Sequence, residues 1–345
     1  MQKQITKIDD LDFAKTILMA FVIIGHCCAF WTGEWFSVIK PAFNSPMLSI
    51  LAKWLNTFHI YGFVLISGFI YAKIIKNGGY SSLKDFLWKK VKRLLIPYFF
   101  VSIIWVIPLS NYFFNFTGEQ ILQNYVLMKA PEHLWFLPML FGVFVFFHLF
   151  RLSLRFETLT ITCIILYVIS FFIPPEYNYF QIIKVCQFIP FFLIGYIFGF
   201  KKENVWREDL NKKRGLSNPF ILLILIIINL LLSAVLSMPE PFRGFRIVLG
   251  AIVNYEGAIS IVSILVYLGH HLILNNKVYH CFSNNNFTIY LFHQPIIYYT
   301  LYYFNGCINP CLNAIINLII AVIGSLLISL ILRKFRYTRV LLGGA

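Results

Sequence analysis

Long apolar stretches recur along the chain and are separated by short segments rich in charged or turn-forming residues. An α-helix needs about 20 residues to cross roughly 30 Å of hydrocarbon, and most of the stretches approach that length. The pattern predicts ten transmembrane helices, of which the shorter ones must extend into the membrane interface. The predicted spans are Phe13–Phe30, Phe58–Ile74, Leu94–Phe113, Leu134–Phe150, Leu159–Ile173, Val185–Phe200, Phe220–Leu236, Ile247–Leu268, Phe287–Phe304 and Leu312–Leu332.

The distribution of Lys and Arg over the connecting segments predicts the orientation of the chain. With both termini in the cytoplasm, 23 of the 29 basic residues fall on the cytoplasmic side and 6 on the outer side. Cytoplasmic loops collect Lys and Arg, so the asymmetry favours an even number of helices with both termini inside. The basic residues on the predicted outer side are Lys40, Lys53, Lys129, Lys184, Arg243 and Arg246.

Composition agrees with a chain that lies in lipid. Only 12% of the 345 residues are charged and 59% are hydrophobic, whereas soluble domains carry about 25% charged residues. Basic cytoplasmic loops account for the net charge of +15, and no basic stripe interleaved with aromatic residues points to nucleic acid. The longest outer loops, Trp31–Thr57 and Phe114–His133, are too short for separate cores. We therefore predict an all-α, polytopic protein whose residues 1–345 form one integral-membrane domain.

His26 lies deep in the first predicted span, where an ionisable side chain is costly and often functional. Lys15 precedes it by eleven residues. At 100° per residue this spacing returns to within about 20° of the same helix face, about 16 Å away along the axis. One face thus presents a cation at the cytoplasmic mouth and an imidazole in the bilayer. The imidazole is suited to accept a proton from an alcohol, but a bond to a neighbouring helix would explain it equally well.

Further polar residues cluster at the outer ends of other spans. His59 begins the second span, and Ser67 follows two turns further in, beside Gly68. A Ser-Gly pair in a membrane helix is most often a point of close packing. His133 and Trp135 open the fourth span, where Trp135 also fits the role of an interfacial anchor.

Two ionisable residues occupy later spans. His293 lies inside the ninth span, two residues before Pro295, and Glu256 lies in the middle of the eighth. A carboxyl group in a membrane needs a proton or a partner. Glu256 could orient one of the histidines, or it could form a structural bond to Asn254 or to a tyrosine.

Six motifs in order resemble the acyltransferase-3 family of membrane O-acyltransferases, in particular its fucose 4-O-acetylase-like branch. They are IDDLDFAKTILMAFVIIGH, FHIYGFVLISGF, KKVKRLLIPYF, HLWFLPML, FFLIGYIFG and IYLFHQP, and together they extend over nearly the whole chain. The family usually has Arg where this chain has Lys15, and a Met-Pro pair that usually follows the second-helix histidine is missing after His59.

The resemblance implies transfer of an acyl group, usually acetyl from acetyl-CoA, to a hydroxyl of a surface polysaccharide or its lipid-linked precursor. It places the chain in a bacterial inner membrane, surrounded by lipid, and suggests no metal. We predict His26 as general base, with direct transfer or an acyl-histidine intermediate, and Glu256 as a second catalytic group. Donor contacts are predicted for Lys15, Lys90, Arg93 and Ser67, and acceptor contacts for His59, His133, Trp135 and His293.

Two other classes of protein fit part of the pattern. A transporter or flippase for a lipid-linked sugar would also have ten helices and polar residues in the membrane, but it would not depend on coenzyme A. A structural membrane subunit would leave the histidines unexplained.

Overall fold

A computed structural model describes residues 9–200, 218–238, 242–272 and 277–343, and these residues form an all-α membrane protein without a β-strand among them. Within these described ranges, eight helical segments are long and apolar enough to cross a membrane. These segments are Asp10–Thr32, Pro46–Lys76, Leu83–Phe114, Glu132–Arg151, Tyr179–Phe200, Pro219–Leu236, Arg243–His271 and Pro310–Leu332.

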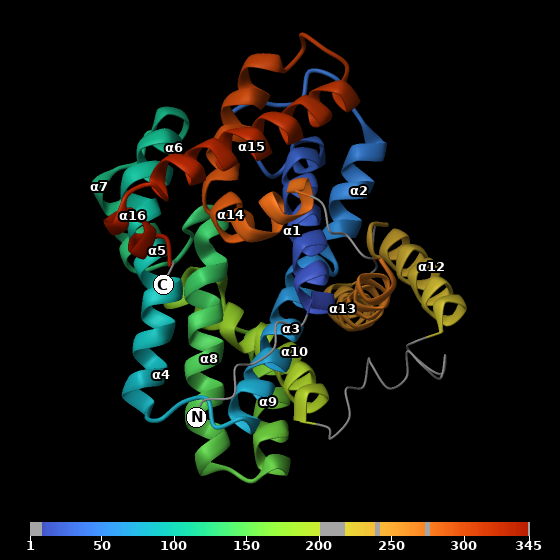
Figure 1. The fold of residues 1–345 in the computed structure, drawn as a ribbon. Helices are drawn as coiled ribbons and strands as arrows, with labels where there is room; N and C mark the ends of the chain where they lie inside the picture. The colour runs from blue at the N-terminus through green and yellow to red at the C-terminus, as the bar shows by residue number, and fades with distance from the viewer. Residues whose placement is uncertain (1–8, 201–217, 239–241, 273–276, 344–345) are drawn as a thin grey trace.

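The helix α1 (Asp9–Ala29) is the centre of the arrangement, and it contacts α2, α3, α13, α14 and α15 (Figure 1). The other helices are α2 (Pro46–Asn56), α3 (His59–Lys76), α4 (Leu83–Lys90), α5 (Ile96–Val101), α6 (Ile107–Phe114), α7 (Gly118–Ile121), α8 (Phe136–Ser153), α9 (Phe156–Ser170), α10 (Ile182–Phe200), α12 (Pro219–Leu236), α13 (Arg243–His271), α14 (Lys277–Phe304), α15 (Pro310–Leu332) and α16 (Arg336–Leu341).

Each of the ten predicted spans coincides with a helical segment, but two of these segments differ in character from the other eight. The helix α9 has 15 residues and is shorter than a full crossing. The helix α14 has 28 residues but carries Ser and Asn side chains over residues 283–286. The count of ten spans and the cytoplasmic termini therefore stay predictions. The helix α2 lies in the segment predicted as an outer loop.

The segment Leu83–Phe114 is one bent helix that alternates between α- and π-helical turns. A π-helical turn precedes Pro97 and another precedes Pro108. Proline has no amide N–H and its ring displaces the preceding turn, so a wider turn accommodates it without breaking the helix. The first of these turns (Val91–Leu95) carries Arg93.

The helices α3 and α10 pack with their backbones in contact at three glycines. A Cβ atom on Gly68 would collide with the carbonyl of Phe192, and one on Gly195 would collide with the carbonyl of Leu65. Gly199 also lies close to α3, where an added Cβ would be 2.6 Å from the carbonyl oxygen of Phe69. Small residues let membrane helices approach in this way, where lipid provides no hydrophobic drive for association. Gly68 is therefore a packing point, and this contact fixes the height of His59 and Ser67 on α3.

A buried amide joins α12 to its neighbours at one edge of the molecule (Figure 1). The side chain of Asn229 is fully buried; its Nδ2 donates to the carbonyl of Val253 on α13 at 3.0 Å, and its Oδ1 accepts from Trp54 Nε1 on α2 at 3.1 Å. A buried amide without such partners would be costly, because hydrocarbon offers no water to bond it. Together these two bonds attach α2 to α12 and α12 to α13.

Substitution of Gly195 by Leu is expected to separate α3 from α10, because its side chain would overlap the α3 backbone. Overpacking of this kind costs at least about 1–3 kcal/mol, which thermal unfolding in detergent would detect. Gly250→Ala is the matched control, since the nearest side-chain atom to its new Cβ lies 3.9 Å away. Equal unfolding temperatures for the two variants would contradict the close α3–α10 contact.

Candidate functional site

Two cavities open along one face of α1. The residues Lys15, Met19 and Val22 line the first cavity, and His26 lines the second. Spacings of four, three and four residues keep these side chains on one helix face, as the sequence predicts for Lys15 and His26. The Lys15 cavity has a volume of about 350 Å³ and the His26 cavity about 610 Å³, which are sizes typical of ligand sites.

The two cavities lie back to back. His59 lines the His26 cavity while its neighbour Ile60 lines the Lys15 cavity. In the same way, Trp135 lines the His26 cavity and Phe136 lines the Lys15 cavity. Because consecutive residues of α3 and of the start of α8 face different cavities, the partition between them is thin, and His26 stands at its edge.

His26 is bonded to a second histidine that is wholly buried behind it. The distance from His26 Nδ1 to His293 Nε2 is 2.8 Å, and the exposed fraction of His293 is 0%. The Nδ1 atom of His293 lies 2.8 Å from the carbonyl oxygen of Tyr290 and 3.2 Å from that of Ile289, one turn back in α14. Carbonyl oxygens accept only, so Nδ1 of His293 carries the proton.

This assignment determines the tautomer of both rings. In an uncharged His293 the proton on Nδ1 leaves Nε2 as an acceptor, so His26 Nδ1 must donate to it. The lone pair of His26 is then on Nε2, which has no hydrogen-bond partner among the described residues. The His26 ring also stacks on Trp35, with centroids 5.5 Å apart and an angle of 28°. The histidine therefore presents a basic nitrogen to its cavity in a fixed orientation.

The side chain of His133 bonds the backbone of α14 and does not line a cavity. Pro295 has no N–H, so the carbonyl of Leu291 loses its helical partner in α14. His133 Nε2 lies 3.2 Å from that oxygen and donates to it, and Trp105 Nε1 donates to the next carbonyl, of Phe292, at 3.1 Å. His133 is 4% exposed and does not line the His26 cavity.

The acceptor residues predicted from the sequence are thus divided by the structure. His59 and Trp135 line the His26 cavity, whereas His133 and His293 lie behind its wall. The Nδ1 atom of His59 bonds the carbonyl of Leu55, one turn back along the chain. Its Nε2 has no bond to a described residue, which makes His59 a second basic nitrogen at this cavity.

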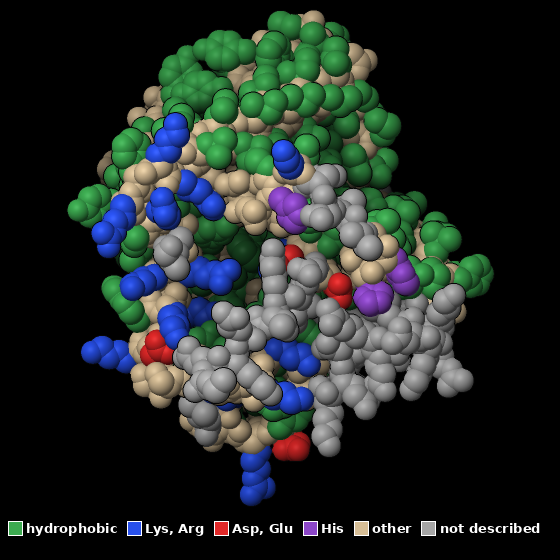
Figure 2. Space-filling model, in the orientation of Figure 1, with side chains coloured by type: hydrophobic (Ala, Val, Ile, Leu, Met, Phe, Trp, Pro, Cys, Tyr) green, Lys and Arg blue, Asp and Glu red, His purple; other side chains and the backbone are tan. Residues whose placement is uncertain are grey.

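The Lys15 cavity is polar at one end and apolar at the other. Arg93, Ser67 and Asn286 contribute polar groups, and Phe63, Leu137 and Leu140 are among its apolar residues. Figure 2 shows Lys and Arg side chains gathered around a hollow on this face, with hydrophobic side chains in its depth.

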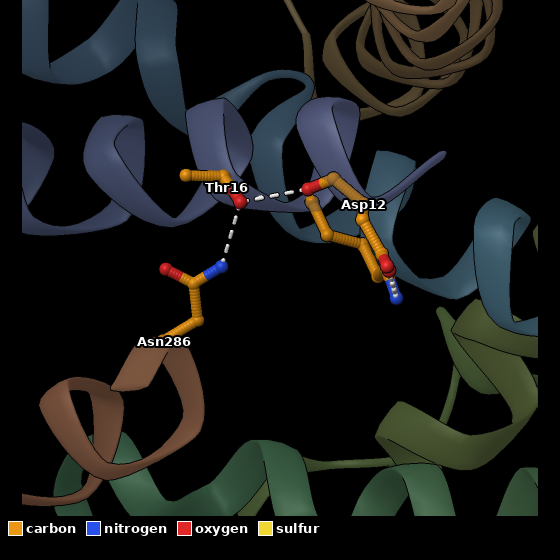
Figure 3. A network of polar contacts seen from close by, with 4 residues as sticks. Asp12, Thr16 and Asn286 are labelled. Carbon is orange, nitrogen blue, oxygen red and sulfur yellow. Dashed lines mark hydrogen bonds and ion pairs between the residues drawn. The ribbon is translucent and has the colours of Figure 1, made fainter. Parts of the chain in front are cut away.

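Polar contacts within the Lys15 cavity connect α1 to α14 (Figure 3). Asn286 Nδ2 donates to Thr16 Oγ1 at 2.9 Å, and Thr16 donates to the carbonyl of Asp12 at 2.7 Å. The Lys15 ammonium forms an ion pair with the Asp12 carboxylate at 2.5 Å. Asp12 therefore neutralises part of the charge of Lys15, and Arg93 is the stronger candidate for an anionic group.

Two predicted residues lie outside both cavities. The Nζ atom of Lys90 lies 3.3 Å from the ring centroid of Phe144, where the ammonium interacts with the π-electrons of the ring. Glu256 on α13 bonds none of the four histidines, and neighbouring Asn254 donates to the hydroxyl of Tyr61 at 2.9 Å. Among the described residues no group of three His, Cys, Asp or Glu side chains is arranged to hold a metal ion.

Several residues of the His26 cavity were not predicted from the sequence, and they come from four separate segments of the chain. They are Trp35, Lys53, Lys129, Gln181 and Lys184. One feature of the sequence could have indicated the lysines, because basic residues are rare on the predicted outer side. No feature of the sequence indicated Trp35, since an aromatic residue in a loop beside the membrane is ordinary.

The fold defines a polytopic membrane protein with two adjoining cavities, one of which is lined by His26. Residues 8–334 match the acyltransferase domain family, and the chain belongs to this acyltransferase-3 family. The chain is thus a multi-pass membrane protein of this family.

One relative adds to this result. Nodulation protein NolL of Mesorhizobium japonicum is 26% identical to the chain over 202 residues, which cover 57% of this chain and 50% of NolL. The chain thus matches about half the length of that curated relative. No solved structure gives a significant match.

Replacement of His133 by Ala is expected to reduce stability, because the carbonyl of Leu291 would be left buried without a donor. The cost is about 1–3 kcal/mol and would appear as a lower unfolding temperature in detergent. His133→Gln, which keeps a side-chain N–H, is expected to recover part of it. A His133→Ala variant with full stability and altered acceptor affinity would support acceptor binding instead.

Proposed function

We propose that the protein transfers an acetyl group from acetyl-CoA to a hydroxyl of a cell-surface polysaccharide or its lipid-linked precursor, in the cytoplasmic membrane of a bacterium. The observation that carries the proposal is the pair of back-to-back cavities with His26 at their boundary. A basic cavity on one side suits a phosphorylated donor, and an open cavity on the other suits a sugar. The residue between them has the nitrogen that the reaction requires.

The donor occupies the Lys15 cavity and enters from the side where the basic loops gather, which is the cytoplasm by the charge distribution. Arg93 and Lys15 at its mouth attract the phosphates of coenzyme A, the guanidinium in a bidentate contact. Ser67 and Asn286 offer partners to the amides of the pantetheine arm. Lys90 lies outside the cavity lining and adds to the positive field around the mouth.

The transfer step uses the free nitrogen of His26. As the acceptor oxygen attacks the thioester carbonyl, Nε2 of His26 takes the proton of the hydroxyl. The tetrahedral intermediate collapses with loss of the coenzyme A sulfur, which receives that proton from His26. The products are the acetylated sugar and free coenzyme A, so His26 returns to its original state.

His293 acts as a positioning residue for this step. Its Nδ1–H is committed to the α14 backbone, so its Nε2 holds the Nδ1–H of His26 throughout. When His26 becomes an imidazolium, the hydrogen bond at 2.8 Å becomes charge-assisted and stronger. The pair thus favours the protonated form at the moment of transfer and keeps Nε2 aimed at the cavity.

The acceptor occupies the His26 cavity, where two tryptophans line the wall. Trp35 stacks on His26, and Trp135 ends the short helical turn that precedes α8. Indole rings suit the apolar face of a sugar ring while its hydroxyls bond elsewhere. A sugar against Trp35 would lie beside the basic nitrogen.

His26→Ala is expected to lower acetyl transfer about 10²- to 10⁴-fold, the usual contribution of a general base. The measurement is mass spectrometry of surface glycans from cells that express wild-type or variant chain, with protein amounts compared by immunoblot. A shift by the mass of one acetyl group in the wild type identifies the reaction.

His59→Gln is the matched comparison, because His59 lines the same cavity with its own free nitrogen. A larger loss for His59→Gln than for His26→Ala would reassign the base. Normal acetylation in His26→Ala cells would remove this histidine from the mechanism. Translocation of a lipid-linked sugar without any need for acetyl-CoA would favour a transporter instead.

Replacement of His293 by Leu is expected to lower kcat about 10- to 100-fold, since a hydrogen bond to a charged group contributes about 1.5–3 kcal/mol. The KM for acetyl-CoA should not change, because His293 does not line the Lys15 cavity. His293→Gln keeps an acceptor atom and should restore part of kcat. Equal kcat values for the Leu and Gln variants, at equal stability, would contradict the positioning role.

A further inference from the structure

Three lysines converge on the His26 cavity, namely Lys53, Lys129 and Lys184. They come from three separate segments of the chain. Basic residues are scarce on the predicted outer side, where 6 of the 29 Lys and Arg residues fall. Half of those six line this one cavity. Three lysines at one outer cavity therefore run against the general distribution of charge, which places most Lys and Arg residues on the cytoplasmic side.

A network of backbone bonds brings two of these lysines to the same wall. Gln181 Nε2 donates to the carbonyls of Met128 and Lys129, at 2.5 Å and 3.1 Å. The amide of Phe180 donates to the carbonyl of Leu127 at 2.8 Å. These bonds join residues 127–129 to residues 180–181, directly before Lys184 in the first turn of α10.

The joined segments have an unusual backbone. Met128, Glu132, Phe180 and Gln181 all have positive φ, between 48° and 59°. Side chains other than glycine rarely adopt this conformation, and such strain gathers at functional sites. The segments that carry Lys129 and Lys184 are therefore kept by the surrounding structure in a backbone conformation that their residues disfavour.

The ammonium groups at this cavity lack carboxylate partners. Among the described residues no Asp or Glu carboxylate oxygen lies within 4.0 Å of the ammonium groups of Lys53, Lys129 or Lys184. Two carboxylates, of Glu34 and Glu132, also line the cavity. Glu34 is exposed, and the oxygens of Glu132 accept from Tyr125 at 2.7 Å and from Gln294 at 3.4 Å. Burial, and then the charge of Glu132, raise the pKa of the Tyr125 phenol, so it stays a donor at neutral pH.

Aromatic rings hold the two half-buried ammonium groups in defined places. Lys184 Nζ lies 5.6 Å from the ring centroid of Trp135, and Lys129 Nζ lies 5.4 Å from that of Tyr179. Interaction with the ring face stabilises each cation without neutralising it. Lys184 thus lies beside the indole against which a sugar would pack.

We propose that Lys184 and Lys129 form a subsite for an anionic group on the acceptor, with exposed Lys53 adding to the field. The inference rests on the proposed function and narrows its acceptor to an acidic sugar or a sugar phosphate. A carboxylate or a phosphate oxygen would bond the two ammonium groups while the hydroxyl reaches His26. The shared chemistry is a fixed negative charge close to the acetylated ring.

The test measures binding to the purified full chain in nanodiscs of zwitterionic lipid, by quenching of tryptophan fluorescence. The probes are methyl β-glucuronide for a carboxylate, glucose 1-phosphate for a phosphate and methyl β-glucoside as the neutral analogue. At least one anionic probe is expected to bind about 10-fold or more tightly than the neutral one. Its affinity should fall as NaCl is added. Comparison of the two anions shows which source of charge the subsite accepts.

The variants separate charge from folding. Lys184→Gln and Lys129→Gln are each expected to weaken the preferred anion about 10-fold and to leave the neutral probe unchanged. Lys184→Arg keeps the charge and should bind the anion nearly as the wild type does. Lys40→Gln is the matched control, because Lys40 is exposed on the same predicted side and does not line the cavity.

Equal affinity for charged and neutral probes, or unchanged anion binding in both Gln variants, would overturn the subsite. Binding of neither anion would overturn it as well. Its failure is distinguishable from failure of the proposed function. Acetyl-CoA-dependent transfer that is equally fast to an acidic and to a neutral acceptor in the wild type, and that is undiminished to the acidic acceptor in Lys184→Gln, rejects the subsite alone. Lysine-dependent anion binding without any transfer from acetyl-CoA retains the subsite and rejects the function.

Discussion

A backbone N–H or C=O group in hydrocarbon must find a partner within the protein, and in α14 this requirement shapes the candidate site. Pro295 leaves the carbonyl of Leu291 without a helical donor, and His133 supplies one. The ring of His293 bonds the carbonyls one turn behind it and so offers its remaining nitrogen to His26. The tautomer of the central histidine therefore follows from bonds that the membrane makes obligatory.

The partition between the cavities depends on how closely the helices approach. Gly68 and Gly195 bring α3 and α10 into backbone contact, and this contact sets the height at which His59 and Ile60 face opposite cavities. At α3 and at the start of α8, neighbouring residues of the chain line different cavities, so these elements separate the two cavities. Larger side chains at Gly68 or Gly195 would push α3 away from α10 and so change the positions of the residues that line both cavities.

The candidate site was predictable where it depends on one helix. The spacing from Lys15 to His26 is a property of helix geometry, so their common face needed no tertiary information. The roles of His133, His293 and Glu256 were not predictable in this way. Each depends on the neighbour that packing supplies: a freed carbonyl for His133, a second imidazole for His293, and for Glu256 a position away from both cavities. Trp35 and the three lysines of the His26 cavity come from separate segments, and no local pattern joins them.

The sequence by itself determined that this protein is an all-α membrane protein, because hydrophobic length and charge asymmetry act segment by segment. Its six ordered motifs also predicted the family that the comparison with known proteins shows. Tertiary structure decided which polar residues face a cavity and which serve the fold. It also placed a helix, α2, in a segment expected to be a loop. The reason is physical: partners in lipid are chosen by helix packing, which brings together residues as distant as His26 and His293.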